Sequence, residues 1–442
     1  MQLFGSSTVK DRSAHVFRSL AVGIMASLLL IFVPVAPAHA APGDPLGSDS
    51  VLVSGWLART LAATNNLALT PTGDTDYAST AYALIGLRAA GQAGDQVISS
   101  ALAMASSGDA FIGDPSQTGQ KASAISLMIL ALIAGNQDPT EYAGSSGTRN
   151  LYTDLESDIH DDGSIGDSPS AYSQAFAILA LLSSPDGVPD PVLHWLEQQP
   201  CTNVSSPGYG GYGFSGPGSC SDVDPDSTAM AVIALIAAGV SADTVSSSGT
   251  YLLSVQDSSG GFTSPMSSVN ANTTGLAVAA LNAIGGMPAD KINRATAYLD
   301  SLVYTCDLAG DTGTSPVVGA MAYDSGSRAS NQINPLAPDV QASLFQASAQ
   351  GIFGFVENIT VPTNYEPPRS ATPDIASSCS TGTEAPPAPP SHGIAAGWWW
   401  AIGGVVVLAA VVVLGWRLIV IRRKTEQSPE HPDKQVRPPL PD

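Results

Sequence analysis

Positively charged residues are scarce in this 442-residue chain, which contains 17 Lys and Arg against 38 Asp and Glu. The segment 41–396 alone holds eight basic and 33 acidic residues, a net charge of −25. Such a surface would repel a phosphate backbone, so we expect no nucleic-acid partner. Charged residues make up only 12% of the chain and hydrophobic residues 44%, which excludes a disordered acidic tail.

Cysteine and histidine are too few and too scattered for a metal centre. No CxxC pair exists, and only His160 and His194 lie in the central part of the chain, so we expect no metal site. Four cysteines allow three disulfide pairings. We favour Cys201–Cys220, because a loop rich in Gly, Ser and Pro joins them, which leaves Cys306–Cys379.

Both ends of the chain carry targeting patterns. Basic residues precede an apolar run over 20–35, and Ala38-His39-Ala40 follows it, which is typical of a secretory signal peptide over 1–40. The segment 397–421 begins with three Trp residues, continues as an apolar run and is followed by basic residues. This pattern predicts one transmembrane helix, with 422–442 as a cytoplasmic tail. We therefore expect an exported protein held in the cell membrane with its ectodomain outside.

A pattern of apolar stretches repeats through 51–351, about every 45 to 55 residues. Each stretch begins with Ser, Thr, Asp or Asn and most end at Gly, which is the chemistry of helix caps. The stretches are apolar on nearly all sides and predict buried helices, with a more polar outer helix after each of the first five. The buried stretches are 79–91, 123–135, 173–182, 227–239, 273–285 and a weaker sixth, 339–351. The outer stretches are 97–105, 151–159, 191–199, 249–256 and 292–304. Together they predict an all-α repeat fold.

One loop after an outer stretch carries a more specific motif. Tyr251-Leu252 is followed after three residues by Gln256, after three more by Gly260, and after one more by Phe262. This resembles the QW repeat of squalene cyclases and other terpenoid cyclases, with Phe262 where that family usually has Trp. The buried stretches are similar to the prenyltransferase/squalene oxidase repeat. The resemblance implies an α/α toroid, that is, an α6/α6 barrel.

The catalytic signatures of the enzymes with this repeat are not intact. Terpenoid cyclases use a DxDD acid, and the nearest match is Asp222-Val223-Asp224-Pro225-Asp226-Ser227, which is incomplete in either register. We expect Asp226 to be the N-cap of the fourth buried helix and Asp224 to lie in the loop before it. Protein prenyltransferases bind zinc through Asp, Cys and His, but the buried stretches contain no Cys or His. We therefore expect no catalytic residues, with a terpenoid cyclase or prenyltransferase-like enzyme as one alternative.

Intrinsic factor and transcobalamin also share the toroid, and they are exported and hold a corrinoid. This resemblance implies a membrane-anchored extracellular protein that captures a corrinoid or similar nutrient at the cell surface. That family closes over its ligand with a small β domain, whereas here a stalk rich in Pro, Ser and Thr occupies 352–396. We therefore expect a separate lid protein or a membrane transporter as a partner. A surface interaction or adhesion module is the other alternative.

We expect the ligand site where the buried helices begin, because helix N-termini offer unpaired N–H groups and partial positive charge. The longest loop leading to such an end, 201–226, is rich in Gly and carries three aromatic residues. For each residue the alternative is structural, with aromatics as wedges between helices and carboxylates as caps. The residues predicted to line the site are Asp76, Tyr77, Tyr209, Tyr212, Phe214, Asp224, Asp226, Phe262 and Tyr323.

Overall fold

The computed structural model describes residues 48–113, 121–144, 147–214, 216–265, 267–306, 316–331 and 334–356, together with 359 and 372–373. The chain separates into a unit spanning Met1–Glu384, to which all described residues belong, and a second unit spanning Ala385–Asp442. The predicted signal peptide, transmembrane helix and tail lie outside the described residues, as does nearly all of the stalk. None of the described helices combines the length and the hydrophobicity that a transmembrane span needs.

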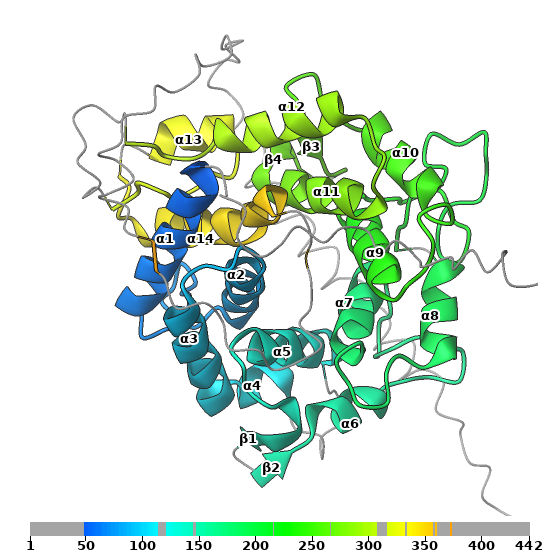
Figure 1. The fold of residues 1–442 in the computed structure, drawn as a ribbon, viewed down its shortest axis with the longest axis horizontal. Coiled ribbons are helices and arrows are strands. Elements are labelled where there is room, and N and C mark those ends of the chain that lie inside the picture. The colour runs from blue at the N-terminus through cyan, green and yellow to red at the C-terminus, as the bar shows by residue number, and fades with distance from the viewer. Residues whose placement is uncertain are drawn as a thin grey trace, which may run out of the picture. The chain divides into compact units, whose positions relative to one another are not determined.

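The described residues are mostly helical, which confirms the all-α expectation in its coarse form (Figure 1). Two short antiparallel sheets interrupt the helices. One pairs β1 (Tyr142–Gly144) with β2 (Gly147–Arg149), and the other pairs β3 (Phe262–Thr263) with β4 (Val269–Asn270). The short helical elements are α4 (Asp109–Ile112), α13 (Ser325–Asn331), η1 (Pro139–Glu141) and η2 (Ile352–Phe355).

Six of the described helices form what we call the buried series, and each overlaps one of the stretches predicted to be buried. Each contacts the next along the chain, and the last contacts the first again, so the order of contacts is closed. In α5, twelve of thirteen residues are buried, because the helix is apolar on all sides. The series comprises α2 (Tyr77–Ala89), α5 (Ala122–Ala134), α7 (Ala171–Leu181), α9 (Pro225–Ala237), α11 (Ala271–Ile284) and α14 (Pro338–Gly351).

A second set of described helices, the peripheral series, packs against the buried series. Figure 1 shows them outside it. They are amphipathic: α12 buries Ala295, Tyr298 and Leu299 on one side and leaves the rest more exposed. Five of them overlap the predicted outer stretches, and the sixth, α1, precedes the first repeat and was not predicted. The peripheral series comprises α1 (Ser48–Ala63), α3 (Gly94–Ser107), α6 (Leu151–Glu156), α8 (Asp190–Glu197), α10 (Ser246–Ser254) and α12 (Ala289–Asp300).

One hydrogen bond recurs where the loop before a buried helix meets that helix. The hydroxyl of Thr228 in α9 accepts the backbone N–H of Tyr212 at 2.9 Å, and Thr274 in α11 accepts that of Phe262 at 2.9 Å. Side chains of α2, α7 and α14 do the same for Ala68, Ile165 and Met321; they are Thr80, Gln174 and Ser348. The repeat seen in the sequence therefore corresponds to a repeated hydrogen bond. In each of five loops this bond gives a buried backbone N–H its acceptor.

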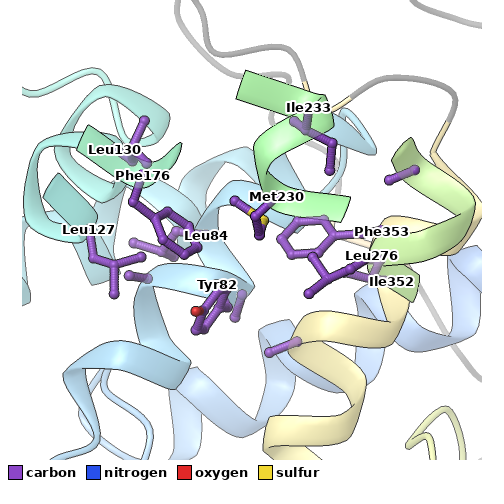
Figure 2. Packing of buried hydrophobic residues seen from close by; sticks show 14 of the residues in the cluster. Tyr82, Leu84, Leu127, Leu130, Phe176, Met230, Ile233, Leu276, Ile352 and Phe353 are labelled. Atoms are coloured by element: carbon purple, nitrogen blue, oxygen red, sulfur yellow. The ribbon is translucent and has the colours of Figure 1, made fainter. Parts of the chain in front are cut away.

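Buried side chains of α2, α5, α7, α9 and α11 meet at the centre of the series (Figure 2). The ring of Tyr82 lies 5.7 Å from Phe176 of α7 and 6.5 Å from Phe353 of η2, measured between centroids. We call the labelled central residues Tyr82, Leu127, Phe176, Met230 and Leu276 the floor; they are between 1% and 7% exposed. At this level the centre is filled by packed side chains.

Candidate ligand-binding rim

The starts of four buried helices are fixed by side-chain caps. Asp76, Ser170, Asp224 and Asn270 each accept the backbone N–H of the residue three positions along. For α9 this bond runs from the N–H of Ser227 to Asp224 Oδ2 at 2.8 Å. Asp224 is therefore the N-cap, and the prediction that Asp226 is the cap was wrong. Pro225 explains the difference, because proline is favoured at the first helical position and so places the cap one residue before it.

In α2, α5, α7, α9 and α11 the residue two positions after the N-cap reaches solvent, and in α14 a residue within the helix does so. In α5, α9, α11 and α14 both chain neighbours of this residue are buried, whereas the residue itself is partly or fully exposed. In α14 the position follows from Ser348, which occupies the place of Thr274 in α11. We call the six residues the rim: Ala78, Ser123, Tyr172, Asp226, Asn272 and Gln346. In five of the helices the rim lies one turn from a floor residue on the same face.

Contacts across the buried series bring the rim groups together. The hydroxyls of Tyr172 in α7 and Tyr82 in α2 lie 2.7 Å apart, although α5 separates these helices in the order of contacts. The ring of Tyr172 also packs edge-on against Phe176 of the floor, at 5.2 Å. On the far side, the side chain of Thr273 in α11 hydrogen-bonds Asp226. The helix starts thus converge on one end of the series.

Asp226 is the carboxyl group of this rim, and its environment disfavours its charged form. Burial, followed by the nearby carboxylate of Asp224, raises the pKa of Asp226 to about 7, while the hydrogen bond from Thr273 opposes the shift. Its Oδ1 atom is buried, and no donor among the described residues reaches it. The same holds for Oδ1 of Asn272, the rim residue of α11. Two buried acceptors therefore lack donors at this end of the molecule.

A cleft of about 220 Å³ opens between the start of α5 and the loop that leads to α7. It includes the rim residue Ser123, and the helix beside it has no side-chain cap. The cleft is lined by Lys121, Ala122, Ser123, Ile165, Gly166, Asp167, Ser168 and Ser173.

Several residues predicted to line the site have structural contacts instead. Phe262 and Tyr212 are only 0% and 2% exposed, so both are wedges between elements, as the structural alternative had it. Tyr77 stacks on Phe111 at 5.4 Å, and its hydroxyl donates to the carbonyl of Ser107 at 2.6 Å. These three rings face neighbouring parts of the fold.

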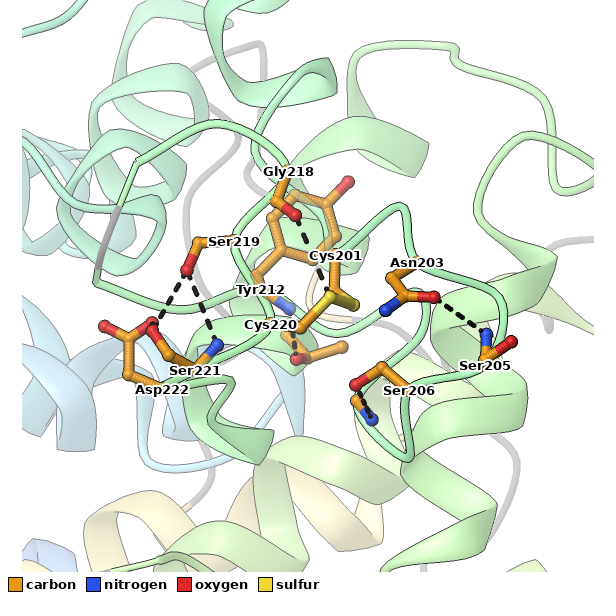
Figure 3. Close-up of a disulfide and its surroundings, with 12 residues drawn as sticks. Cys201, Asn203, Ser205, Ser206, Tyr212, Gly218, Ser219, Cys220, Ser221 and Asp222 are labelled. Atoms are coloured by element: carbon orange, nitrogen blue, oxygen red, sulfur yellow. Dashed lines mark hydrogen bonds between the residues drawn. A yellow bond between two sulfur atoms is a disulfide. The ribbon is translucent and has the colours of Figure 1, made fainter.

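The loop over 201–226 is held by the predicted disulfide Cys201–Cys220, which the structure confirms (Figure 3). Tyr209 and Phe214 lie on it and are 40% and 60% exposed. Cys306 is also disulfide-bonded, and Cys379, its predicted partner, lies outside the described residues.

The predicted residues that the structure does bring together are Asp224, Asp226 and Tyr323. The carboxyl group of Asp226 acts electrostatically on the phenol of Tyr323. The backbone carbonyl of Tyr323 accepts the N–H of Ala271, at the start of α11, at 2.8 Å. Asp76 caps α2 and acts on Tyr82. Sequence reasoning missed Ser123, Tyr172, Asn272 and Gln346. The predicted stretches at 173 and 273 begin one residue after Tyr172 and Asn272, and Ser123 is itself a predicted start, so the first residues of the stretches were the available signal.

Comparison with known proteins adds little to this geometry. Among the described residues, no group of three or more His, Cys, Asp or Glu side chains could hold a metal ion. No protein-family model matches the chain, and no curated protein matches it. A crystal structure of a protein from Actinoplanes is similar over 69% of this chain and 99% of that one, with 14% identity and a TM-score of 0.43. This similarity is too low to carry an argument about fold or function.

Proposed function

We propose that residues 51–351 form an α/α toroid that binds a small-molecule ligand at its rim, outside the cell. The toroid is supported by the closed order of contacts along the buried series and by the peripheral helices packed against it. The hydrogen bond repeated in five loops also supports it, since it makes the repeats structurally equivalent.

The rim is the observation that carries the binding proposal. The buried helices present a side chain at equivalent positions around one end of the series, and these side chains are mostly polar above an apolar floor. Ligand sites in general combine an apolar surface with a few converging polar groups. Two of the converging polar atoms, on Asp226 and Asn272, lack the hydrogen bonds that buried oxygens normally have. A bound ligand would supply them.

Export and membrane anchoring belong to the same proposal. The disulfide Cys201–Cys220 supports them, because disulfides persist in oxidising compartments. The patterns over 1–40 and 397–421 support them from the sequence. A corrinoid as the ligand, and a separate lid protein or membrane transporter as the partner, are proposed from the resemblance to transcobalamin alone.

The proposal is tested by blocking the rim. We expect full-length protein, purified in mild detergent from its own host, to release a small molecule on denaturation, detected by mass spectrometry. Ser123→Trp should deplete that molecule, because Ser123 is exposed both on the rim and in the cleft. A released corrinoid would be visible by its absorbance.

The matched control is Ser106→Trp, which places the same ring on an exposed position of peripheral helix α3. It should retain the molecule, and both variants should melt within a few degrees of the wild type. Release of no molecule from any of the three proteins, or equal release from all, would contradict the proposal.

A terpenoid cyclase-like enzyme is the second candidate, favoured by one observation. Asp226 is a partly buried carboxyl with a pKa raised to about 7, and such a group can act as an acid near neutral pH. Against it, Asp224 serves as a helix cap and the DxDD pattern is incomplete. Cyclisation of a polyprenyl substrate that is lost in Asp226→Asn and retained in Ser123→Ala would establish the enzyme.

A further inference from the structure

We infer that the rim binds a cationic group with N–H donors, such as an ammonium or amidinium, with Asp226 as its counter-ion. This inference rests on the proposed function and narrows the chemical class of its ligand. It follows from a count of the donors and acceptors that face one another around Asp226.

The backbone donors at the starts of α9 and α11 are largely used. Pro225 has no N–H, and the N–H of Ser227 is bonded to Asp224 at 2.8 Å. In α11, the N–H of Ala271 bonds the carbonyl of Tyr323 at 2.8 Å and that of Thr273 bonds Asn270 at 2.9 Å. Helix N-termini generally attract anions, but here the caps have taken the groups that an anion would need.

The acceptors, by contrast, are in excess. Oδ1 of Asp226 and Oδ1 of Asn272 are buried without donors, and they belong to equivalent positions of two adjacent helices. Asp224 already accepts from Ser227 and from Ser264, the latter at 3.3 Å. A ligand that completes this site must therefore donate hydrogen bonds rather than accept them.

The charges around Asp226 point to a positively charged donor. The side-chain groups acting on it are Asp224, which disfavours its ionisation, and Thr273, which favours it; no basic side chain contributes. A partly buried carboxylate without a positive partner is costly, and a bound cation would relieve that cost. Its other titratable neighbours are phenols from four different elements, namely Tyr82, Tyr172, Tyr251 and Tyr323. Burial raises the pKa of each of these phenols, so they stay neutral and supply no charge that competes with a bound cation.

The test compares three probes of similar shape: benzylammonium, benzyl alcohol and benzoate. Each is titrated calorimetrically into full-length protein in mild detergent, stripped of bound small molecules, at pH 6 and pH 8. Benzylammonium should bind most tightly. Its affinity should be about tenfold higher at pH 8, because a carboxyl group with a pKa near 7 is mostly ionised there and mostly neutral at pH 6.

Asp226→Asn should weaken benzylammonium binding at pH 8 by about tenfold or more, the loss expected for one charge-assisted hydrogen bond. It should also abolish the pH dependence. Asp190→Asn is the matched control, because Asp190 is an exposed carboxylate in the first turn of peripheral helix α8. It should change neither property.

Absence of benzylammonium binding, equal binding of the alcohol, preference for benzoate, or unchanged affinity in Asp226→Asn would overturn the inference. The proposed function would survive that result if wild-type protein still released a small molecule that Ser123→Trp lacks. If neither the probes nor a released molecule were found, both would fail.

Discussion

The carboxyl group of Asp226 makes folding depend on pH in a direction opposite to that of most aspartates. Its pKa is raised to about 7 in the folded protein from 3.8, so between about pH 4 and pH 7 the folded state holds a proton that the unfolded chain has released. Stability therefore falls as pH rises through this window and levels off above it. Asp300 acts in the same direction, since burial and then the carboxylate of Asp49 raise its pKa to about 7.

Asp226→Asn should therefore stabilise the protein at neutral and alkaline pH. We expect a gain of about 1–3 kcal/mol at pH 8, discounted for the partial exposure of the group, and almost none near pH 4. Urea unfolding of full-length protein at both pH values measures it. Asp300→Asn should remove a separate share of the dependence of the unfolding free energy on pH. Asp190→Asn should leave that dependence unchanged. An Asp226→Asn variant with the wild-type pH slope would show that this carboxyl group titrates normally.

At the scale of elements, the loop of the QW-like motif joins one repeat to the next. The amide of Gln256 donates to the carbonyls of Gly260 and of Lys291 in α12, both at 2.8 Å. Gly260 has φ of +98°, and a Cβ there would collide with the backbone of Arg294 in the same helix. The motif therefore serves packing: the glutamine ties the loop to the peripheral helix, and the glycine lets the two backbones approach.

Gly260→Ala should destabilise the protein more than Gly285→Ala. Gly285 also has a positive φ, +71°, but nothing lies within 4 Å of an added Cβ. Its substitution therefore costs only backbone strain, roughly 1–3 kcal/mol, because φ of 71° with ψ of 160° is a conformation that residues with a Cβ rarely adopt. Gly260→Ala adds a collision with backbone atoms and should cost about twice that or more. Thermal unfolding measured by circular dichroism compares the two variants, and equal melting temperatures would count against the packing role.

The sequence predicted the elements well because their signals are local. Apolar stretches that begin with Ser, Thr or Asp and mostly end at glycine follow from cap chemistry and periodicity. The observed caps Asp76, Ser170 and Asn270 lie three residues before the predicted starts. The N-cap of α9 was assigned to the wrong residue because three aspartates lie within 222–226. Only the position of Pro225 shows which of them is the cap. Helix α1 was missed because it precedes the repeated pattern.

The rim could be predicted only in part, because its members are brought together by long-range contacts. Tyr82 and Tyr172 are 90 residues apart in the chain, and their hydroxyls meet across the series. The most prominent aromatics in the sequence, Tyr212 and Phe262, are buried. The sequence could identify them as repeated features. Their burial depends on which elements pack against them in the folded protein, and the local sequence does not show this.

At the scale of the whole molecule, closure links the two ends of the helical region. Phe353 of η2, near the end of the described chain, packs with Tyr82 of the first buried helix. Trp56 of α1 donates through its ring N–H to the carbonyl of Pro316 at 2.8 Å. Open repeat arrays contact only their neighbours, whereas here the first and last repeats share one core. That arrangement is consistent with the single folded ectodomain that we propose.

The predicted topology can be tested by protease shaving of intact cells. The helical region buries its backbone hydrogen bonds, and it includes η2, which takes up the first residues that the sequence assigned to the stalk. The rest of the predicted stalk, up to 396, is rich in Pro, Ser and Thr and is expected to be extended. Protease should therefore cut within the stalk and release a folded, strongly acidic fragment, identified by its helical circular dichroism and its Cys201–Cys220 disulfide. The tail over 422–442 should stay protected until the cells are lysed, and deletion of 398–414 should release the whole protein into the medium. A protected helical region with an accessible tail would reverse the orientation, because basic residues would then lie on the outer side of the membrane.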